Sequence, residues 1–220
     1  MVTVKIGSRG EAVKCLERAV GRKPTGEFDV VLDAMVRALQ GAYGLERDGI
    51  VGPRTWSALA GVEILPGEPM RSTAPRAGRD IRYVIVHHSD TRTRDGMVRA
   101  LNVAGREAST HYSVDVDGTV HCHADPLDVV TWHCPGANLH GIGVDIVHRR
   151  GEPFLDVQVA AAGRLLRWLC RIHGLPAVAA EGRFPAEGQL ARQAWGVAGH
   201  GQLRATRCPD GFPIAAALAG

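Results

Sequence analysis

Two nearly unbroken apolar runs, at residues 83–86 and 141–147, most constrain what this chain can fold into. Each run is short and contains several β-branched residues, which is typical of a strand. Neighbouring side chains of a strand point to opposite sides, so a strand that is apolar at consecutive positions must be buried on both faces. These runs therefore predict strands inside a sheet that is covered on both faces.

The segments around these runs predict a mixture of strands and helices. Residues 111–115 and 119–123 flank a short turn, which predicts a hairpin. Residues 197–200 predict a short last strand, and residues 156–173 carry apolar side chains at helical spacing. A shorter helix is expected after Pro209. The fold class expected for this part is α+β, with a mixed β-sheet flanked by helices.

The N-terminal part of the chain differs, because its apolar residues recur at helical spacing. Three short helices are expected, over residues 10–20, after the N-cap residue Asp29, and after Gly52 and Pro53. The residues of the second helix expected to face inward are Ala34, Met35, Ala38 and Leu39. We therefore expect a three-helix domain at 1–62, a linker rich in proline and glycine at 63–79, and a second domain at 80–220.

Two histidines and a cysteine stand on segments that a sheet can bring together. His87 ends the first apolar run, His200 ends the last predicted strand, and Cys208 follows in a loop. Strand ends are held rigidly side by side, so both imidazoles can be fixed while the loop adds a thiolate. This donor set suits zinc, and three protein ligands leave a fourth position for water. One Zn²⁺ ion is therefore expected here, although the His-to-Cys spacing alone is a weak motif.

Two further residues are candidates for the chemistry. Asp145 is a carboxylate inside the second apolar run, where a charge is costly unless it is used. The alternative is a structural Asp that is satisfied by backbone or arginine partners. His133 is expected to donate to a developing oxyanion or to contact substrate. A second metal site at Cys122 and Cys134 is disfavoured, because the residues around Cys122 alternate along a strand.

Composition limits the class of partner. The formal net charge is only +3 over 220 residues and the arginines are scattered, which argues against nucleic acid. A slight positive charge still favours approach to an anionic cell wall. No apolar run is long enough to span a membrane, and the N-terminus lacks the apolar region of a signal peptide. We expect a monomer that is made in the cytoplasm and does not insert into a membrane.

The first domain resembles the three-helix peptidoglycan-binding domain found at the ends of many cell-wall hydrolases. The matching stretches are residues 7–13, 25–29 and 44–56, and the last of these, GLERDGIVGPRTW, is the most specific. Glu17 replaces the glutamine that is usual in the first helix. The resemblance implies that this domain binds cell-wall peptidoglycan.

Five ordered motifs of the second domain resemble type-2 N-acetylmuramoyl-L-alanine amidases, a family that includes phage lysozyme-like amidases and peptidoglycan recognition proteins. The motifs are VIVHHS at 84–89, STHYSVDVDGTV at 109–120, TWH at 131–133, GIGVDI at 141–146, and the stretch from GH at 199–200 to CP at 208–209. The resemblance implies a mixed sheet flanked by helices and one zinc ion on His87, His200 and Cys208. It also implies cleavage of the amide between the lactyl group of muramic acid and L-Ala of the stem peptide.

The chain departs from this family at positions that bear on catalysis. Asp145 stands where many members have a glutamate base, and its side chain is one methylene shorter. Thr206 stands where many members have a lysine that steadies the oxyanion, so either the rate is lower or Arg204 or Arg207 substitutes. Thr110 stands where another branch has a functional tyrosine, so the chain does not follow that branch.

These observations favour a peptidoglycan hydrolase of the endolysin type, made inside a bacterium during phage infection and released to the wall at lysis. Two alternatives stay open. The first is a recognition protein that binds muropeptides without cutting them; such proteins usually lack the cysteine ligand, whereas Cys208 is present. The second is a host amidase that recycles wall fragments, which needs no wall-binding domain.

Overall fold

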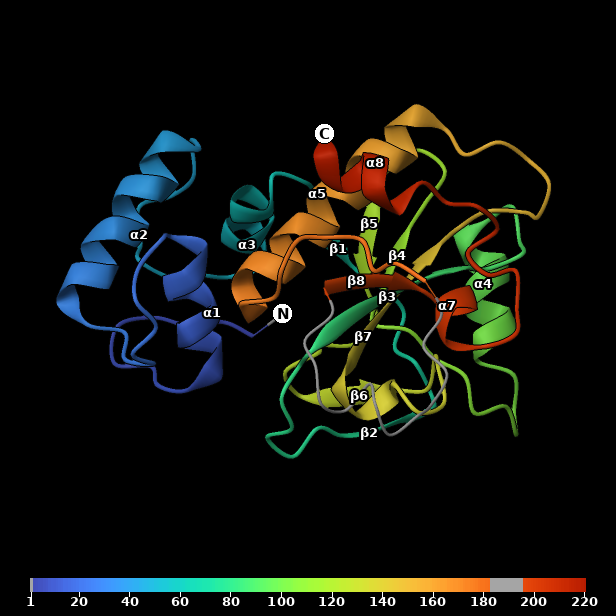
Figure 1. Ribbon diagram of the computed structural model, residues 1–220. Coiled ribbons are helices and arrows are strands. Elements are labelled where there is room, and N and C mark those ends of the chain that lie inside the picture. Colours follow the sequence, from blue (N-terminus) through green and yellow to red (C-terminus); the bar gives the residue numbers. More distant parts are fainter. Residues whose placement is uncertain (1, 183–195) are drawn as a thin grey trace.

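The computed structural model describes residues 2–182 and 196–220. The helices are α1 Glu11–Ala19, α2 Val30–Ala42, α3 Pro53–Ala60, α4 Arg94–Leu101, α5 Asp156–His173, α7 His200–Leu203 and α8 Ile214–Ala219, with a 3-10 helix, η1, at Asn138–His140. The strands are β1 Ile64–Pro66, β2 Thr73–Pro75, β3 Tyr83–His88, β4 Tyr112–Val114, β5 Val120–Cys122, β6 Val129–Thr131, β7 Gly141–Ile146 and β8 Gly196–Gly199. Figure 1 shows the first three helices grouped beside the part of the chain that holds the sheet.

The three N-terminal helices begin where the sequence predicts. The Asp29 carboxylate accepts the backbone N–H of Leu32 at 2.8 Å, which satisfies an otherwise unpaired donor at the start of α2. The buried Glu17 carboxylate accepts the backbone N–H and hydroxyl of Thr25 and the backbone N–H of Gly26, each at 2.7 Å. Three donors converge on Glu17, so an ionised acceptor suits this position better than the usual glutamine.

The inward face predicted for α2 is wrong. Leu32, Val36 and Gln40 are the buried residues of this helix, whereas Ala34 and Ala38 are exposed and Met35 and Leu39 are only half-buried. Apolar residues occur on nearly every side of α2, so hydrophobicity does not select one face. Gln40 decides the orientation through hydrogen bonds with Gly49, Asp48 and Ile50 in the following loop.

Six strands form one mixed sheet in the order β1-β5-β4-β7-β3-β8. β4 and β5 pair antiparallel as a hairpin, and the other neighbours in this sheet pair in parallel. β2 and β6 form a separate two-stranded antiparallel ribbon. The mixed sheet with flanking helices confirms the expected fold class. The short strands β1, β2 and β6 and the helices α4 and α7 were not predicted. His200 was expected to end the last strand, but β8 ends at Gly199 and His200 begins α7.

Helix α5 packs against one face of the sheet (Figure 1). Val84 and Val86 of β3 join the apolar core formed with α5, whereas Tyr83 and Ile85 belong to a second apolar cluster. Every residue of β3 and of β7 is buried, as expected for strands covered on both faces. Because side chains alternate along a strand, His87 lies on the face of Tyr83 and Ile85, away from α5.

The segment expected as a linker contributes two strands, since β1 pairs with β5 and β2 with β6. The N-terminal helices also contact the second domain. Trp56 of α3 meets Trp168 of α5 edge-on, with ring centroids 6.3 Å apart, and a guanidinium N–H of Arg18 donates to the Ile172 carbonyl at 3.0 Å. One apolar core therefore runs through both domains. Among the described helices, none has the length and apolar character needed to cross a membrane.

Candidate active site

The carboxyl ends of three neighbouring parallel strands carry the site. The ladder between β3 and β8 pairs Val86 with Gly199, so His87 and His200 follow directly at the same edge of the sheet. On the other side of β3, the ladder with β7 pairs His87 with Asp145. Paired residues of adjacent strands point to the same face, about 4.8 Å apart. Sheet register therefore places both histidines and the carboxylate together.

Cys208 reaches this edge from the segment between α7 and α8. The backbone N–H of His88 donates to its sulfur at 3.3 Å, which ties the thiol to the end of β3. The backbone N–H of Cys208 in turn donates to the Thr206 hydroxyl at 3.3 Å. The loop is thus held at both the side chain and the backbone of Cys208.

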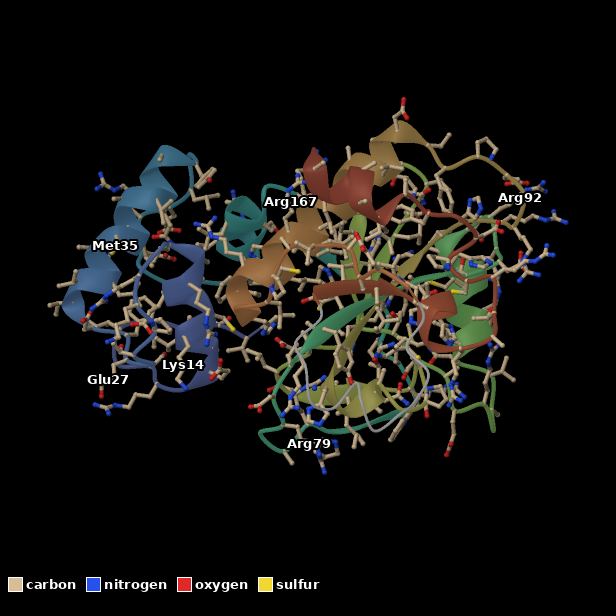
Figure 2. All side chains as sticks on the ribbon, viewed as in Figure 1. Lys14, Glu27, Met35, Arg79, Arg92 and Arg167 are labelled. Carbon is tan, nitrogen blue, oxygen red and sulfur yellow. The ribbon has the colours of Figure 1, made fainter. Side chains whose placement is uncertain are left out.

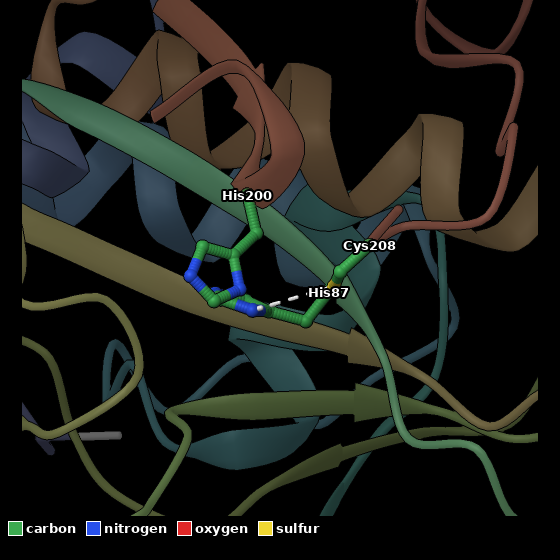
Figure 3. A group of neighbouring side chains, drawn as sticks. All are labelled: His87, His200 and Cys208. Atoms are coloured by element: carbon green, nitrogen blue, oxygen red, sulfur yellow. Dashed lines mark hydrogen bonds between the residues drawn. The ribbon is translucent and has the colours of Figure 1, made fainter. Parts of the chain in front are cut away.

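His87, His200 and Cys208 offer one ligand atom each, and these atoms all lie within 4.8 Å of one another. Figure 3 shows the three side chains converging from different segments. The Nδ1 atom of His87 lies 3.8 Å from the Cys208 sulfur, and the rings of His87 and His200 have centroids 4.7 Å apart. Bond lengths of about 2.0–2.3 Å in a tetrahedral zinc site imply ligand atoms about 3.3–3.7 Å apart. Small side-chain adjustments therefore suffice for this donor set to hold zinc.

At neutral pH the two imidazoles are in the form that binds a cation, whereas the thiol still carries its proton. Burial lowers the pKa of His87 well below its usual range, and the imidazoles of His133 and His200 lower it further. Burial also lowers the pKa of His200, with a contribution from the positive charge of Arg204. Burial raises the pKa of the Cys208 thiol to about 12. Both imidazoles are thus neutral, and metal binding must displace the thiol proton.

His133 contacts the ligand candidate His87 directly. Its Nδ1 atom lies 3.1 Å from His87 Nε2, so one imidazole donates to the other. Gly143 of β7 makes room for it, because a Cβ atom at that position would lie 2.8 Å from His133 Cγ. The Nε2 atom of His133 is buried and has no hydrogen-bond partner among the described residues. Other parts of the His133 side chain line the cavity beside His87.

Asp145 is buried with an unusually basic carboxyl group. Burial raises its pKa to about 7, while a hydrogen bond with Thr110 and the positive charge of Arg106 act in the opposite direction. A carboxyl group with a pKa near neutrality can accept and return a proton at physiological pH. The environment of Asp145 therefore suits acid–base chemistry.

A cavity of about 300 Å³ contains these side chains together. Its walls include all three metal-ligand candidates, Asp145 and His133, as well as Trp132 and two arginines, Arg106 and Arg150. The walls combine apolar surface with convergent polar groups, which is typical of a small-molecule or catalytic site.

Comparison with known proteins identifies the family. A family model described as N-acetylmuramoyl-L-alanine amidase matches residues 77–211, which is more than half of the chain. The chain belongs to this family. A second model, described as a peptidoglycan binding domain, matches residues 11–59 of the amidase. Both resemblances noted in the sequence are thereby confirmed.

Solved structures with a similar fold include proteins from several organisms. They include an endolysin N-acetylmuramoyl-L-alanine amidase from Clostridium intestinale URNW, with 18% identity, a TM-score of 0.48 and coverage of 71% of this chain and 93% of that chain. Drosophila peptidoglycan recognition protein SA has 19% identity, a TM-score of 0.46 and coverage of 72% and 84%. Staphylococcus aureus hydrolase AmiA in complex with its ligand has 21% identity, a TM-score of 0.48 and coverage of 63% and 65%. No curated protein matches the chain.

The structure brings five of the six predicted site residues of the amidase to one cavity: His87, His200, Cys208, Asp145 and His133. The sixth, Thr206, does not line that cavity and instead accepts a hydrogen bond from the backbone of Cys208. Thr110 forms a side-chain hydrogen bond with Asp145, and this bond lowers the pKa of that carboxyl group. Arg106 and Arg150 were not singled out from the sequence, because both lie in loops with no motif that marks them. The roles of all these residues remain predictions.

Proposed function

We propose that this amidase is a zinc-dependent peptidoglycan hydrolase that cleaves the amide between the lactyl group of N-acetylmuramic acid and L-Ala of the stem peptide. The observation that carries the proposal is the convergence of two imidazoles and a thiol within 4.8 Å beside a buried carboxyl group. The family supports amidase activity, and the N-terminal domain supports peptidoglycan as the partner.

His87, His200 and Cys208 would hold the zinc ion, because two neutral imidazoles and a thiolate form a borderline-soft donor set that zinc prefers. A bound zinc ion supplies a Lewis acid that polarises a carbonyl and activates water. The cavity around the three ligands offers room for the water and for the substrate carbonyl. These features fit a catalytic zinc site better than a closed structural one.

Asp145 supplies the proton transfers. It takes a proton from the attacking water as the C–O bond forms, and it delivers this proton to the leaving nitrogen as the C–N bond breaks. A pKa of about 7 lets the same carboxyl group do both. Its place opposite His87 on the neighbouring strand supports a direct reach to the reacting water.

His133 has two roles in the proposal. Through its Nδ1 atom it fixes the ring of His87, and a partner on the second nitrogen of a ligand imidazole sets its tautomer and orientation. As a side chain that lines the cavity, it contacts the substrate carbonyl or the oxyanion that develops from it. Thr206 contributes through the position of Cys208, since its hydroxyl holds the backbone beside the ligand.

We also propose that the protein is a phage endolysin. A wall-binding domain joined to a wall-cleaving domain suits an enzyme that must act on an insoluble polymer. On this proposal the protein is made in the cytoplasm and acts on the wall after release. A test is expression inside a bacterium with and without a phage pore protein; lysis only with the pore supports this role.

The test of the activity is digestion of purified sacculi, followed by mass spectrometry of the products. We expect intact glycan strands and free stem peptides with an L-Ala amino terminus. A chelator should abolish these products, and added zinc should restore them. Binding of sacculi without any cleavage in the presence of zinc would instead favour a recognition protein.

A further inference from the structure

A second hollow lies at the opposite end of β3 from the metal-ligand candidates. This junction groove has a volume of about 620 Å³ and is lined by α1, by Arg76 and residues 78–82, by Leu127 and by residues 173–175 at the end of α5. No residue that lines it also lines the catalytic cavity. Figure 2 labels Lys14 on α1 and Arg79 on the loop before β3, which come from the two domains and line this groove together.

Positive charge dominates the junction groove. Five basic and two acidic side chains line it: Lys14, Arg18, Arg76, Arg79 and Arg82, with Glu11 and Asp80. The acidic side chains are already engaged, since Glu11 pairs with Lys14 and Arg18, and Asp80 pairs with Arg82. Within residues 2–182 and 196–220, no carboxylate lies within ion-pair distance of Arg76 or Arg79. The groove therefore carries surplus positive charge from both domains.

Arg76 is the one buried arginine among the basic residues that line the groove. Its side chain is only 2% exposed, and its terminal N–H groups donate to the neutral carbonyls of Leu139 and Gly141 at 3.0 and 3.2 Å. Its Nε atom is buried without a hydrogen-bond partner, as is the Nε2 atom of His173, which also lines the groove. A buried cation without an ion-pair partner among the described residues is costly, so these residues favour the approach of an anion.

The electrostatics of the two buried groups agree with this interpretation. Burial, followed by the neighbouring charge of Arg79, lowers the pKa of Arg76 to about 10, and the more weakly acting charges of Asp125 and Tyr83 do not offset this. Burial, followed by the charges of Arg18 and Arg76, lowers the pKa of His173 to about 3. Both groups therefore lie in a positive field that a bound anion would relieve.

We propose that the junction groove binds carboxylates of peptidoglycan stem peptides, as a site separate from the catalytic cavity. This inference rests on the proposed function, because peptidoglycan is the partner that both domains share. Guanidinium groups match carboxylates in shape and charge, and a groove between arginines from two segments suits an acidic peptide. The site has contributions from the wall-binding domain and from the catalytic domain.

The distance between the two sites gives the groove a role. Arg82 and His87 are separated by five residues of extended chain, about 17 Å at roughly 3.3 Å per residue. The groove shares no lining residue with the catalytic cavity, so a stem peptide held in it leaves the position of the scissile amide free. The groove retains a neighbouring stem, so that the enzyme stays on the wall between cleavage events.

The test uses charge reversal at two accessible positions in the full-length protein. Lys14→Glu combined with Arg79→Glu reverses the groove, and Lys23→Glu reverses an exposed lysine that does not line it. Each protein is treated with a chelator and sedimented with sacculi from which phosphodiester-linked polymers have been removed. We expect the double variant to bind about tenfold more weakly at low salt, and the control to bind like the unchanged protein.

Three further measurements make the outcome decisive. Amidation of the stem carboxylates should remove the difference between the unchanged protein and the double variant. Hydrolysis of a soluble muropeptide with zinc should be the same for all proteins, and its absence in the unchanged protein would refute the proposed activity rather than the groove. The double variant Lys14→Ala with Arg79→Ala should also bind the sacculi more weakly, by a smaller factor than the charge reversal. Its unfolding midpoint should match that of the unchanged protein, which shows that the fold is intact.

Equal binding of the unchanged protein and the double variant to the stripped sacculi would overturn the proposal. A difference that appears only when phosphodiester-linked polymers are retained would also overturn it, because the ligand would then carry phosphate rather than carboxylate groups.

Discussion

At the scale of single residues, the candidate site depends on what surrounds each titratable group. Asp145 sits in a strand whose other side chains are apolar, and this burial raises its pKa to about 7. His87 is buried and His133 is half-buried, and one hydrogen bond joins their imidazoles. The same residue types on the surface would have ordinary pKa values and no fixed orientation.

The role of Asp145 as a base gives a direct prediction for turnover. Asp145→Asn should lower kcat by about a hundredfold or more, because an amide cannot accept the proton. Zinc content should remain, since Asp145 is outside the ligand set. Steady-state hydrolysis of a soluble muropeptide and metal analysis of the same sample measure both; near-normal turnover would remove Asp145 from the mechanism.

The raised pKa of Asp145 also predicts how stability depends on pH in the metal-free protein. The folded state holds the proton up to about pH 7, whereas the unfolded state releases it near the ordinary value of 3.8. Stability is therefore lost as pH rises between these values, by about 1.4 kcal/mol for each pKa unit. Asp145→Asn removes this loss.

Urea unfolding of both proteins with chelator, at pH 5 and pH 8, isolates the effect. The variant should gain a few kcal/mol relative to the unchanged protein between these pH values, because the histidines contribute equally to both. An identical pH dependence of the two proteins would show that Asp145 is ionised normally in the fold.

At the scale of elements, Gly143 of β7 leaves the space that lets the loop residue His133 contact the ligand candidate His87. Gly143→Ala would place a Cβ atom 2.8 Å from His133 Cγ, so the imidazole must move away from His87. Loss of a partner that orients a ligand typically lowers metal affinity about 10–100-fold. Competition with a zinc-binding dye measures the change, and Gly52→Ala, where a Cβ meets no neighbour within 4 Å, should leave affinity unaltered.

The sequence predicts those elements whose pattern is local and strong. The apolar runs indicated β3 and β7, and the helical spacing indicated α5 over its full length. α2 was predicted, but the face that it buries was not, because its orientation depends on hydrogen bonds between Gln40 and the loop that follows the helix. β1 and β2 were missed because three-residue strands are defined by their partners rather than by their own sequence.

The same reasoning separates the predictable part of the site from the rest. Residues at strand ends are placed by register, so His87, His200 and Asp145 could be grouped from the sequence. Arg106, Arg150 and the junction groove depend on how loops and domains pack, and no motif marks them.

At the scale of the whole molecule, the two domains share one apolar core. Val13 and Leu16 of α1 are fully buried in the cluster that also contains Trp168 and Leu169 of α5. Deletion of residues 1–62 should therefore destabilise the catalytic domain as well as remove wall binding, by about 3 kcal/mol or more if the loss resembles that of one large core side chain. Urea unfolding of the truncated chain measures this.

Trp56→Ala is the matched variant, because it keeps the N-terminal helices in the chain and removes the ring contact with Trp168, together with the hydrogen bond from the indole N–H to the Val2 carbonyl. This variant should lose part of the unfolding free energy that the truncated chain loses. A truncated domain as stable as the full chain would mean that the two domains fold independently.

The most direct test of the whole account is X-ray absorption at the zinc edge of the purified protein. We predict one zinc ion per chain, with two nitrogen neighbours at about 2.0 Å and one sulfur neighbour at about 2.3 Å. The sulfur neighbour should vanish in Cys208→Ala and persist in Cys122→Ala. A protein without bound zinc, or a zinc shell without sulfur, would contradict the proposal that His87, His200 and Cys208 form the metal centre.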